Sequence, residues 1–438
     1  MLSDDATTPT KIANWLRSDG TDLYPEPTAA AIAGLPDYGF LLVIIPAHNE
    51  GQRIARTLNS LREQTRQADA VIVAADNCTD DTVSIALAEG VTVTETTNNS
   101  LRKAGALNQT LAAVLPKLDS DDVILLMDAD TRLNENFIAS VTSTMWSDTG
   151  RTQLGGVGGV FMGDMEEWSL IQQFQQNEYV RYARKLGRRH GRALVLTGTG
   201  SIFRVRVLRE IIDGRRNGTI PDVGISQSVY DTDSLTEDNE LTLAVKSLGM
   251  RTVSPKDCQV YTALMQTLRN LYTQRRRWQR GALENLMTHG LHPYTAPYIA
   301  KQIAAYVAIM FLPLYVSTLT IQLIRGGDHG LFPPFWVAVA ILYVVEQTWS
   351  VRRGGWRGVV LSALVVPEII YSMFLDVVFL VSIAGLVKAR QEIWGRGIDL
   401  ESDDSVRDQG VGVIAKAPTD TTTSFAARHL AASSAHFP

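Results

Sequence analysis

Short apolar runs and helix-spaced apolar positions alternate along the first part of the chain. Between residues 40 and 127 this pattern predicts strands and helices in strict turn. The strands are expected at 41–45, 70–74, 91–94 and 123–127, and the helices at 53–64, 82–88 and 103–115. Such an order is typical of a parallel sheet wrapped by helices, and open sheets of this kind bind ligands at the carboxyl ends of their strands.

The alternation continues less regularly as far as residue 248. Runs at 155–161 and 195–203 predict two further strands, with a helix over 168–186 between them, and a helix over 237–248 begins with its own acidic residues. We therefore expect one α/β domain over residues 39–265. The extension before it, over residues 1–38, contains a short amphipathic segment at 11–16 that is expected to pack on the domain or to lie on a membrane.

Three long apolar stretches distinguish the last part of the chain, at 303–324, 331–349 and 359–387. They are long enough to cross the roughly 30 Å hydrocarbon core of a bilayer. Pro367 and Glu368 interrupt the third stretch, which predicts an interfacial helix over 359–366 and a span over 369–387. Two short spans are the alternative interpretation. The sequence thus predicts interfacial helices over 266–299 and a transmembrane region of about three helices over 300–389.

Basic residues give the expected orientation of these spans. Arg352, Arg353 and Arg357 indicate a cytosolic loop after the second span. Lys388, Arg390 and Arg396 indicate a cytosolic tail as well, which conflicts with three spans and leaves their number open. From residue 390 to 438 the chain is expected to be largely disordered, because periodicity is lost after residue 400.

Composition agrees with a domain that faces the cytosol and a membrane-embedded end. The 438 residues are 45% hydrophobic and 20% charged, and most of the charge precedes residue 290. A net charge of −5, without a basic cluster beyond the arginines at 275–277, argues against nucleic acid as a partner. The polar N-terminus has no signal-peptide pattern, and Cys78 and Cys258 fit a reducing compartment. We expect the catalytic domain on the cytosolic face of the plasma (inner) membrane.

Acidic residues follow the predicted strands at the edge where a ligand is expected. Asp128 and Asp130 are two positions apart after an apolar strand, so their carboxylates project to the same side and can approach one cation. Oxygen ligands together with a substrate phosphate suit Mg²⁺ or Mn²⁺. Lys103 opens a predicted helix, and the free amides of a helix start favour an anion.

Four elements recur in the order of a known family: Asp76, Asp128-Ala129-Asp130, Thr236-Glu237-Asp238 and Gln274-Arg275-Arg276-Arg277-Trp278. As an ordered set, they resemble the D, DxD, D, QxxRW series of membrane-bound processive family 2 glycosyltransferases, such as the synthases of cellulose, hyaluronan, chitin and poly-N-acetylglucosamine. The resemblance covers about residues 40 to 390. It implies a GT-A-like (Rossmann-like) cytosolic domain, then interfacial helices and a C-terminal transmembrane helix bundle.

The resemblance also implies a role for individual residues. Asp238 would be the general base, and Asp128 and Asp130 would be the metal ligands. The donor-binding residues implied are Pro46, His48, Glu50, Asp76, Lys103, Asp128, Gln274, Arg277 and Trp278. The acceptor-binding residues implied are Gly198, Thr199, Gly200, Glu237 and Trp278, and Asn108 would meet the donor diphosphate beside Lys103.

The function implied is inverting, Mg²⁺- or Mn²⁺-dependent transfer from a UDP-sugar, with processive synthesis of a β-linked polysaccharide at the bilayer. Two alternatives remain: transfer of one or a few sugars to a lipid or protein acceptor, and a catalytically silent membrane adaptor. Glu237 and Asp238 could also simply favour a helix N-terminus, and Arg275 and Arg276 could form a basic surface for anionic lipid. Charges at Glu346, Glu368 and Asp376 are expected to face protein, water or the interface, lining a channel or pairing helices.

Overall fold

The computed structural model describes residues 39–147, 153–165, 167–224, 226–325 and 334–395. The chain divides into a unit that ends at Leu386 and a second that begins at Val387, of which the end of one helix is described. The helices and strands described below belong to the first unit, apart from the end of the helix that crosses this boundary. The amphipathic segment expected at 11–16 and the disorder expected after residue 400 lie outside the described residues.

A seven-stranded sheet forms the centre of the domain, in the order β3-β2-β1-β4-β8-β6-β9. Its strands are β1 (Leu41–Ala47), β2 (Ala70–Ala75), β3 (Thr92–Glu95), β4 (Val123–Leu126), β6 (Leu154–Gly158), β8 (Ser201–Arg204) and β9 (Arg251–Val253). The first four strands are parallel neighbours, as the sequence predicts, but β8 runs antiparallel to both β4 and β6. The expectation of a wholly parallel sheet is therefore wrong: after β6 the chain returns to the edge where β6 ends, and β8 starts there.

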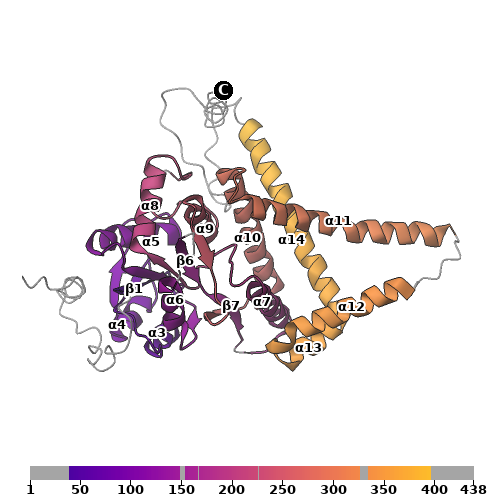
Figure 1. Cartoon of the computed structure of the whole chain (residues 1–438), viewed down its shortest axis with the longest axis horizontal. Coiled ribbons are helices and arrows are strands. Elements are labelled where there is room, and N and C mark those ends of the chain that lie inside the picture. Colours follow the sequence, from indigo (N-terminus) through magenta and orange to yellow (C-terminus); the bar gives the residue numbers. More distant parts are fainter. Residues whose placement is uncertain (1–38, 148–152, 166, 225, 326–333, 396–438) are drawn as a thin grey trace, which may run out of the picture. The chain divides into compact units, whose positions relative to one another are not determined.

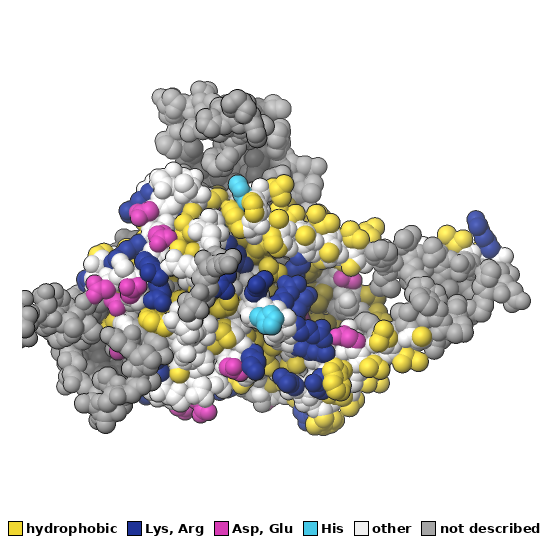
Figure 2. Space-filling model, in the orientation of Figure 1, with side chains coloured by type: hydrophobic (Ala, Val, Ile, Leu, Met, Phe, Trp, Pro, Cys, Tyr) yellow, Lys and Arg dark blue, Asp and Glu magenta, His cyan; other side chains and the backbone are white. Residues whose placement is uncertain are grey.

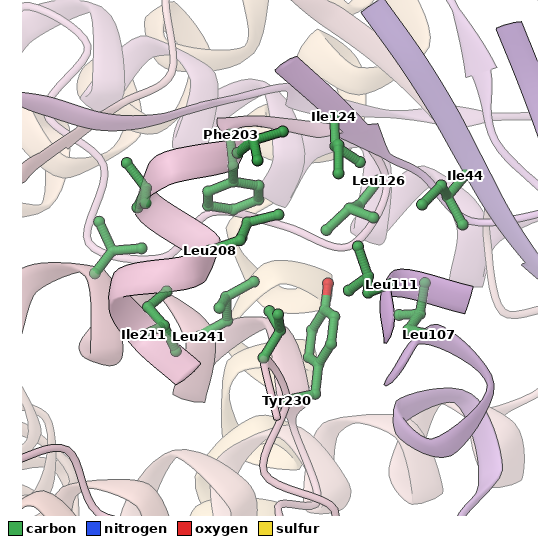
Figure 3. Close-up of a cluster of buried hydrophobic side chains, with 14 of the residues drawn as sticks. Ile44, Leu107, Leu111, Ile124, Leu126, Phe203, Leu208, Ile211, Tyr230 and Leu241 are labelled. Atoms are coloured by element: carbon green, nitrogen blue, oxygen red, sulfur yellow. The ribbon is translucent and has the colours of Figure 1, made fainter. Parts of the chain in front are cut away.

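Both faces of the sheet are buried, which explains why its strands read as continuous apolar runs. On β1, Leu41, Val43 and Ile45 pack on one face, whereas Leu42 and Ile44 pack on the other. The helices of the first face are α3 (Ile54–Arg62), α4 (Thr82–Ala88) and α6 (Phe137–Trp146), and those of the second are α5 (Arg102–Val114), α8 (Val205–Arg216) and α9 (Glu237–Ser247) (Figure 1). Figure 3 shows the second core, which includes Leu107, Phe203, Leu208, Tyr230 and Leu241.

The strands expected at 155–161 and 195–203 are divided differently. Gly159 separates β6 from β7 (Val160–Asp164), which joins β5 (Arg132–Leu133) and β10 (Gln259–Ala263) in a small second sheet. Residues 195–200 form a loop, not a strand, and a short 3₁₀ turn, η1 (Leu115–Lys117), follows α5. The long helix α7 (Leu170–Arg188) lies between the two segments, close to the expected range of 168–186.

Five helices follow the sheet: α10 (Leu268–His289), α11 (Ala296–Ile324), α12 (Pro334–Val351), α13 (Trp356–Ala363) and α14 (Val365–Gly395), with a 3₁₀ turn, η2 (Arg352–Gly354), before α13. The break predicted at Pro367 falls at Leu364, and Pro367 is the third residue of α14. Proline is tolerated there because the first amides of a helix have no partner within it. Among the described residues, Val365–Leu386 of α14 is the one helical segment apolar and long enough to cross a membrane.

The first half of α14 packs on α7 and α10. Tyr371, Phe374 and Leu375 share an apolar cluster with Phe174 of α7 and Leu271 of α10. Glu368 is buried and receives hydrogen bonds from Arg181 and Asn177 of α7, so it faces protein, which is one of the environments expected for it. Glu346, by contrast, is exposed, with Arg184 at 3.9 Å.

Replacement of Ile44 by alanine tests the central position of β1. Its side chain is fully buried, so the loss of apolar contacts and the cavity left behind should lower the free energy of unfolding by about 2–5 kcal/mol. Denaturant unfolding measures this change. The matched control is Leu87→Ala, because Leu87 is 53% exposed and should change stability little. Equal losses in both variants would contradict the proposed core.

Candidate active site

The carboxyl ends of β1, β2 and β4 bring the first group of predicted residues together. Pro46 lies in β1, His48 and Glu50 follow it, Asp76 follows β2, and Asp128 and Asp130 follow β4. Asn49 and Asn77 take positive φ values of 55° and 49°, a conformation that asparagine tolerates better than most residues. The His48 Nδ1 atom lies 2.6 Å from the carbonyl oxygen of Asp76, so the turns after β1 and β2 touch.

Asp76 holds the neighbouring loops in place. Its Oδ1 atom accepts hydrogen bonds from Asn99 Nδ2 at 2.8 Å, Thr96 Oγ1 at 2.8 Å and Asn77 Nδ2 at 3.0 Å. The side chain is buried. Its other oxygen, Oδ2, makes no hydrogen bond within the described part of the chain, and it is the atom of Asp76 that remains free to accept one from a ligand.

Lys103, in the first turn of α5, joins acidic residues from distant parts of the sequence. Its Nζ atom lies 2.6 Å from Asp128 Oδ1 and 2.8 Å from Glu237 Oε1. Burial lowers the pKa of Lys103, but the charges of Asp128, Glu237 and Asp238 outweigh it and raise the pKa well above its ordinary value. Gly198 passes close by: a Cβ there would lie 2.8 Å from the ammonium group. The DxD and Thr-Glu-Asp motifs thus share one cation.

Asp238 and Glu237 differ in environment although they are adjacent at the start of α9. Asp238 Oδ2 accepts a hydrogen bond from the Gly198 amide at 3.1 Å, and Oδ1 accepts one from the Asn239 amide at 2.8 Å. Burial and the charge of Glu237 raise the pKa of Asp238. Burial also acts to raise the pKa of Glu237, but Lys103 and then Arg277 bring it below its ordinary value. Of the two carboxylates, Asp238 is therefore the stronger proton acceptor.

A small pocket of 10 Å³ lies at this junction. Its lining residues are Pro46, Lys103, Leu107, Leu126, Met127, Gly198, Tyr230, Glu237 and Asp238. No sequence pattern marked Tyr230, which lies in a loop without periodicity. Asn108 Nδ2 donates to the Tyr230 carbonyl at 2.9 Å, and the Tyr230 amide donates to Asn108 Oδ1 at 3.0 Å. The Asn108 amide group therefore holds the Tyr230 backbone, and its contact with a donor diphosphate stays a prediction.

Asp128 and Asp130 have the chemistry of a partial site for a divalent cation. Burial and the charges of Asp128 and Glu50 raise the pKa of Asp130 to about 6, which marks an excess of negative charge. The described residues contain no group of three His, Cys, Asp or Glu side chains arranged to hold a metal ion. Two carboxylates completed by substrate phosphates are, however, the usual protein site for Mg²⁺. The residues present therefore fit such an ion when the donor is bound.

Helix α10 brings the Gln274–Trp278 segment against the start of α9. Asn285 Nδ2 donates to the Thr236 carbonyl at 3.2 Å and to Thr236 Oγ1 at 3.1 Å. Gly281 makes this approach possible, because a Cβ there would lie 2.5 Å from Thr236 Oγ1. Arg277 is exposed and close enough to Glu237 to affect it, as stated above. Gln274 has a buried Oε1 atom without a hydrogen-bond partner in the described part of the chain.

Trp278 is held by Arg275. The Arg275 guanidinium carbon lies 4.6 Å from the Trp278 ring centroid and 5.7 Å from that of Tyr179. Arg275 is buried, so its interpretation as part of a lipid-facing basic surface is wrong, whereas Arg276 is exposed. Burial raises the pKa of Tyr179. The charge of Arg275 acts to lower this pKa, and the charges of Glu178 and Asp130 act to raise it. Tyr179 is therefore close enough to both Arg275 and Asp130 to feel their charges.

The residues expected to line an acceptor pocket form a tight turn. Thr199 Oγ1 lies 2.7 Å from Thr197 Oγ1, and the Gly200 carbonyl accepts a hydrogen bond from the Gly159 amide at 2.7 Å. A Cβ at Gly200 would lie 3.2 Å from Phe137, so little room exists there for a side chain. Gly198 is the member of this turn that borders Asp238 and Lys103.

Comparison with known proteins identifies related chains. Residues 36–281 match the family described as Glycosyltransferase like family 2. The uncharacterized glycosyltransferase YaiP of Escherichia coli (strain K12) is 23% identical over 352 residues, which cover 78% of this chain and 82% of that protein.

Two solved structures resemble the fold at 18% sequence identity. The mannosyltransferase PcManGT from Pyrobaculum calidifontis, in complex with GDP-Man and Mn²⁺, matches with a TM-score of 0.47 over 82% of this chain and 94% of that chain. Glucosyl-3-phosphoglycerate synthase from Mycobacterium tuberculosis, in complex with Mn²⁺, UDP and glucosyl-3-phosphoglycerate, matches with a TM-score of 0.35 over 60% and 85%.

Replacement of Asp130 by asparagine should stabilise the protein at neutral pH when no divalent cation is present. The pKa of Asp130 is about 6 in the fold against an ordinary 3.8, so folding disfavours its ionised form, and this cost grows as the pH rises between the two values. Thermal unfolding in EDTA should show a higher Tm for the variant at about pH 7.5 and a shrinking difference toward about pH 4. Asp257→Asn, at an exposed position, is the control. A difference that does not depend on pH would contradict the assignment.

Proposed function

The chain belongs to glycosyltransferase-like family 2, and we propose that it transfers a sugar from a UDP-sugar to an acceptor hydroxyl with inversion at the anomeric carbon. The observation that carries this proposal is the position of Lys103, which contacts Asp128 at 2.6 Å and Glu237 at 2.8 Å and so joins the donor-side and acceptor-side motifs. An intact set of charged groups around one pocket also argues against a catalytically silent adaptor.

On the donor side, Asp128 and Asp130 would hold Mg²⁺ or Mn²⁺ together with the diphosphate. Such an ion would neutralise the charge that develops on the leaving UDP. Lys103 would add a positive charge at the same place, and the exposed Arg277 would approach the diphosphate from α10, where a guanidinium can bind two oxygens at once. Pro46, His48, Glu50 and the free oxygen of Asp76 would contact the nucleoside at the ends of β1 and β2.

On the acceptor side, Asp238 would act as the general base. It would take the proton of the acceptor hydroxyl while that oxygen forms a bond to the anomeric carbon and the bond from this carbon to the diphosphate oxygen breaks. A raised pKa makes Asp238 a better proton acceptor than an ordinary carboxylate, and its hydrogen bond from Gly198 fixes its orientation. Trp278 would offer a flat face to an acceptor sugar, beside Glu237 and the turn at Gly198, Thr199 and Gly200.

The C-terminal helices would attach this domain to a bilayer. Large apolar side chains of α11, α12 and α14 are exposed, among them Ile303, Val307, Met310, Ile341, Leu342, Ile370 and Val377. Beside them, Figure 2 shows a gathering of Lys and Arg side chains. The end of α7 and the loop after it form a basic run: Lys185, Arg188, Arg189 and Arg192 are exposed and make no ion pair in the described part of the chain. Anionic lipid on a cytosolic face would attract such a surface.

Purified protein should release UDP from at least one member of a panel of UDP-sugars when Mg²⁺ or Mn²⁺ is present, and EDTA should abolish this release. UDP detection with each donor measures the reaction, and mass analysis of the product identifies what is made. Long products would support processive synthesis of a β-linked polysaccharide, and addition of one or a few sugars would support the non-processive alternative. Release from none of the donors would refute the proposal.

Replacement of Asp238 by asparagine should lower the transfer rate by roughly 10²–10⁴-fold, because the amide cannot take the acceptor proton. Donor binding should change little, since Asp128, Asp130 and Lys103 remain. Initial rates and calorimetric titration with UDP measure the two effects separately. Asp257→Asn again serves as the control. An Asp238→Asn variant with the rate of the wild type would exclude Asp238 as the base.

The protein should sediment with membranes and should remain there after alkaline carbonate extraction, if α11, α12 and α14 enter the bilayer. Fractionation of expressing cells followed by immunoblotting measures this. Recovery in the soluble fraction would contradict the proposed membrane attachment, but it would not test the transferase reaction.

A further inference from the structure

Arg275 differs from the two arginines that follow it. Arg276 and Arg277 are exposed, whereas the Arg275 side chain is 9% exposed and lies between Trp278 and Tyr179. A buried guanidinium is costly unless it is paired. Its partner is Glu178 of α7, whose Oε2 atom accepts a hydrogen bond from Arg275 Nη2 at 3.1 Å. The position of Arg275 is therefore fixed from two sides.

Glu178 connects this arginine to the apolar helix α14. The same Oε2 atom accepts a hydrogen bond from the Tyr371 hydroxyl at 3.0 Å. The Tyr371 ring also stacks on Phe174, with the centroids 4.7 Å apart and an angle of 3° between the planes. One carboxylate oxygen thus joins α7, α10 and α14.

The face of α7 that carries Glu178 contacts α13 and α14 as well as α10. Phe174, Asn177, Glu178 and Arg181 follow the spacing of one helix face. Arg181 donates to both oxygens of Glu368, at 2.9 Å and 3.1 Å, and Asn177 donates to Glu368 and to Ser362. These contacts fix the first turns of α14, so the Tyr371 hydroxyl is held in a definite position relative to Glu178.

We propose that Arg275 is a positioning residue that sets the plane of the Trp278 indole, and that Tyr371 of α14 determines the position of Arg275 through Glu178. The attachment of an apolar C-terminal helix would then control how the acceptor platform is presented. This inference rests on the proposed function in one respect, the role of Trp278 in acceptor binding. Asp128 and Lys103 belong to other elements, and among the described residues no hydrogen bond or ion pair joins them to Arg275, Glu178 or Tyr371.

Fluorine NMR of protein labelled with 5-fluorotryptophan tests the inference without turnover. The chain has eight tryptophans, and the signal missing from a Trp278→Phe variant identifies Trp278. In Tyr371→Phe, Glu178→Gln and Arg275→Lys, the Trp278 signal should shift or broaden while the signals of distant tryptophans stay in place. Arg275→Lys keeps the charge but loses the planar group that covers the indole.

The matched control is Tyr306→Phe. Tyr306 of α11 also bonds α10, accepting a hydrogen bond from Gln279 Nε2 at 2.9 Å, and its hydroxyl donates to the Phe379 carbonyl of α14 at 3.4 Å, but within the described residues no hydrogen bond joins it to Arg275. The Tyr306→Phe variant removes this hydroxyl and so tests whether weaker packing of α10 in general moves the Trp278 indole. A Trp278 signal that is unchanged in Tyr371→Phe and Glu178→Gln, or that shifts equally in Tyr306→Phe, would overturn the inference.

Turnover adds a second criterion. With the UDP-sugar that the wild-type protein uses, hydrolysis to water in the absence of acceptor should retain its donor KM in Tyr371→Phe. A roughly tenfold to hundredfold rise in donor KM, the size expected for loss of a hydrogen bond to a charged group, would contradict the assignment to the acceptor side. If the wild type turns over no donor, the proposed function fails, and the NMR result alone decides whether Tyr371 and Glu178 position Trp278.

Discussion

The ammonium group of Lys103 is the interaction on which the site depends. Three carboxylates, from Asp128, Glu237 and Asp238, approach one another at the meeting point of β4, α5 and α9. Like charges at such distances repel, and burial makes each of them costlier. Lys103 offsets this repulsion, and it does so unequally: it pairs with Asp128 and Glu237 directly, and Asp238 is left with a raised pKa. The same ion pairs thus bring the pocket residues together and contribute to the difference between the lowered pKa of Glu237 and the raised pKa of Asp238.

A second excess of negative charge lies at Asp130. Burial and then the charges of Asp128 and Glu50 raise the pKa of Asp130 to about 6, and the charges of Arg53 and Lys103 offset this only in part. A fold selected for stability alone would avoid this arrangement, because ionised Asp130 is disfavoured at neutral pH. A cation bound with a diphosphate donor would remove this penalty, so the ionised Asp130 that is unfavourable for folding would be favourable for binding. This is a common balance at functional sites.

The helices that follow the sheet contact the residues of the site. Gly281 and Asn285 of α10 contact Thr236 directly, and Arg275 links α10 to α7 through Glu178. Because α7 also binds Glu368 and Tyr371, the first half of α14 shares its packing with the catalytic domain. The apolar helix α14 is therefore joined through α7 to α10, the helix that contacts Thr236.

The sequence by itself determined the alternating strands and helices up to β4 and the membership of glycosyltransferase-like family 2, and it predicted that Asp128 and Glu237 would lie at one site, because apolar periodicity is local and the motifs keep their order along the chain. It did not determine the antiparallel β8, the loop at 195–200 or the commitment of Asn108 to Tyr230, since these depend on where the chain returns after a long excursion. Nor did it separate Arg275 from its neighbours. Three consecutive arginines look alike in a sequence, and only the phase of α10 against α7 decides which one is buried beside a carboxylate and an indole.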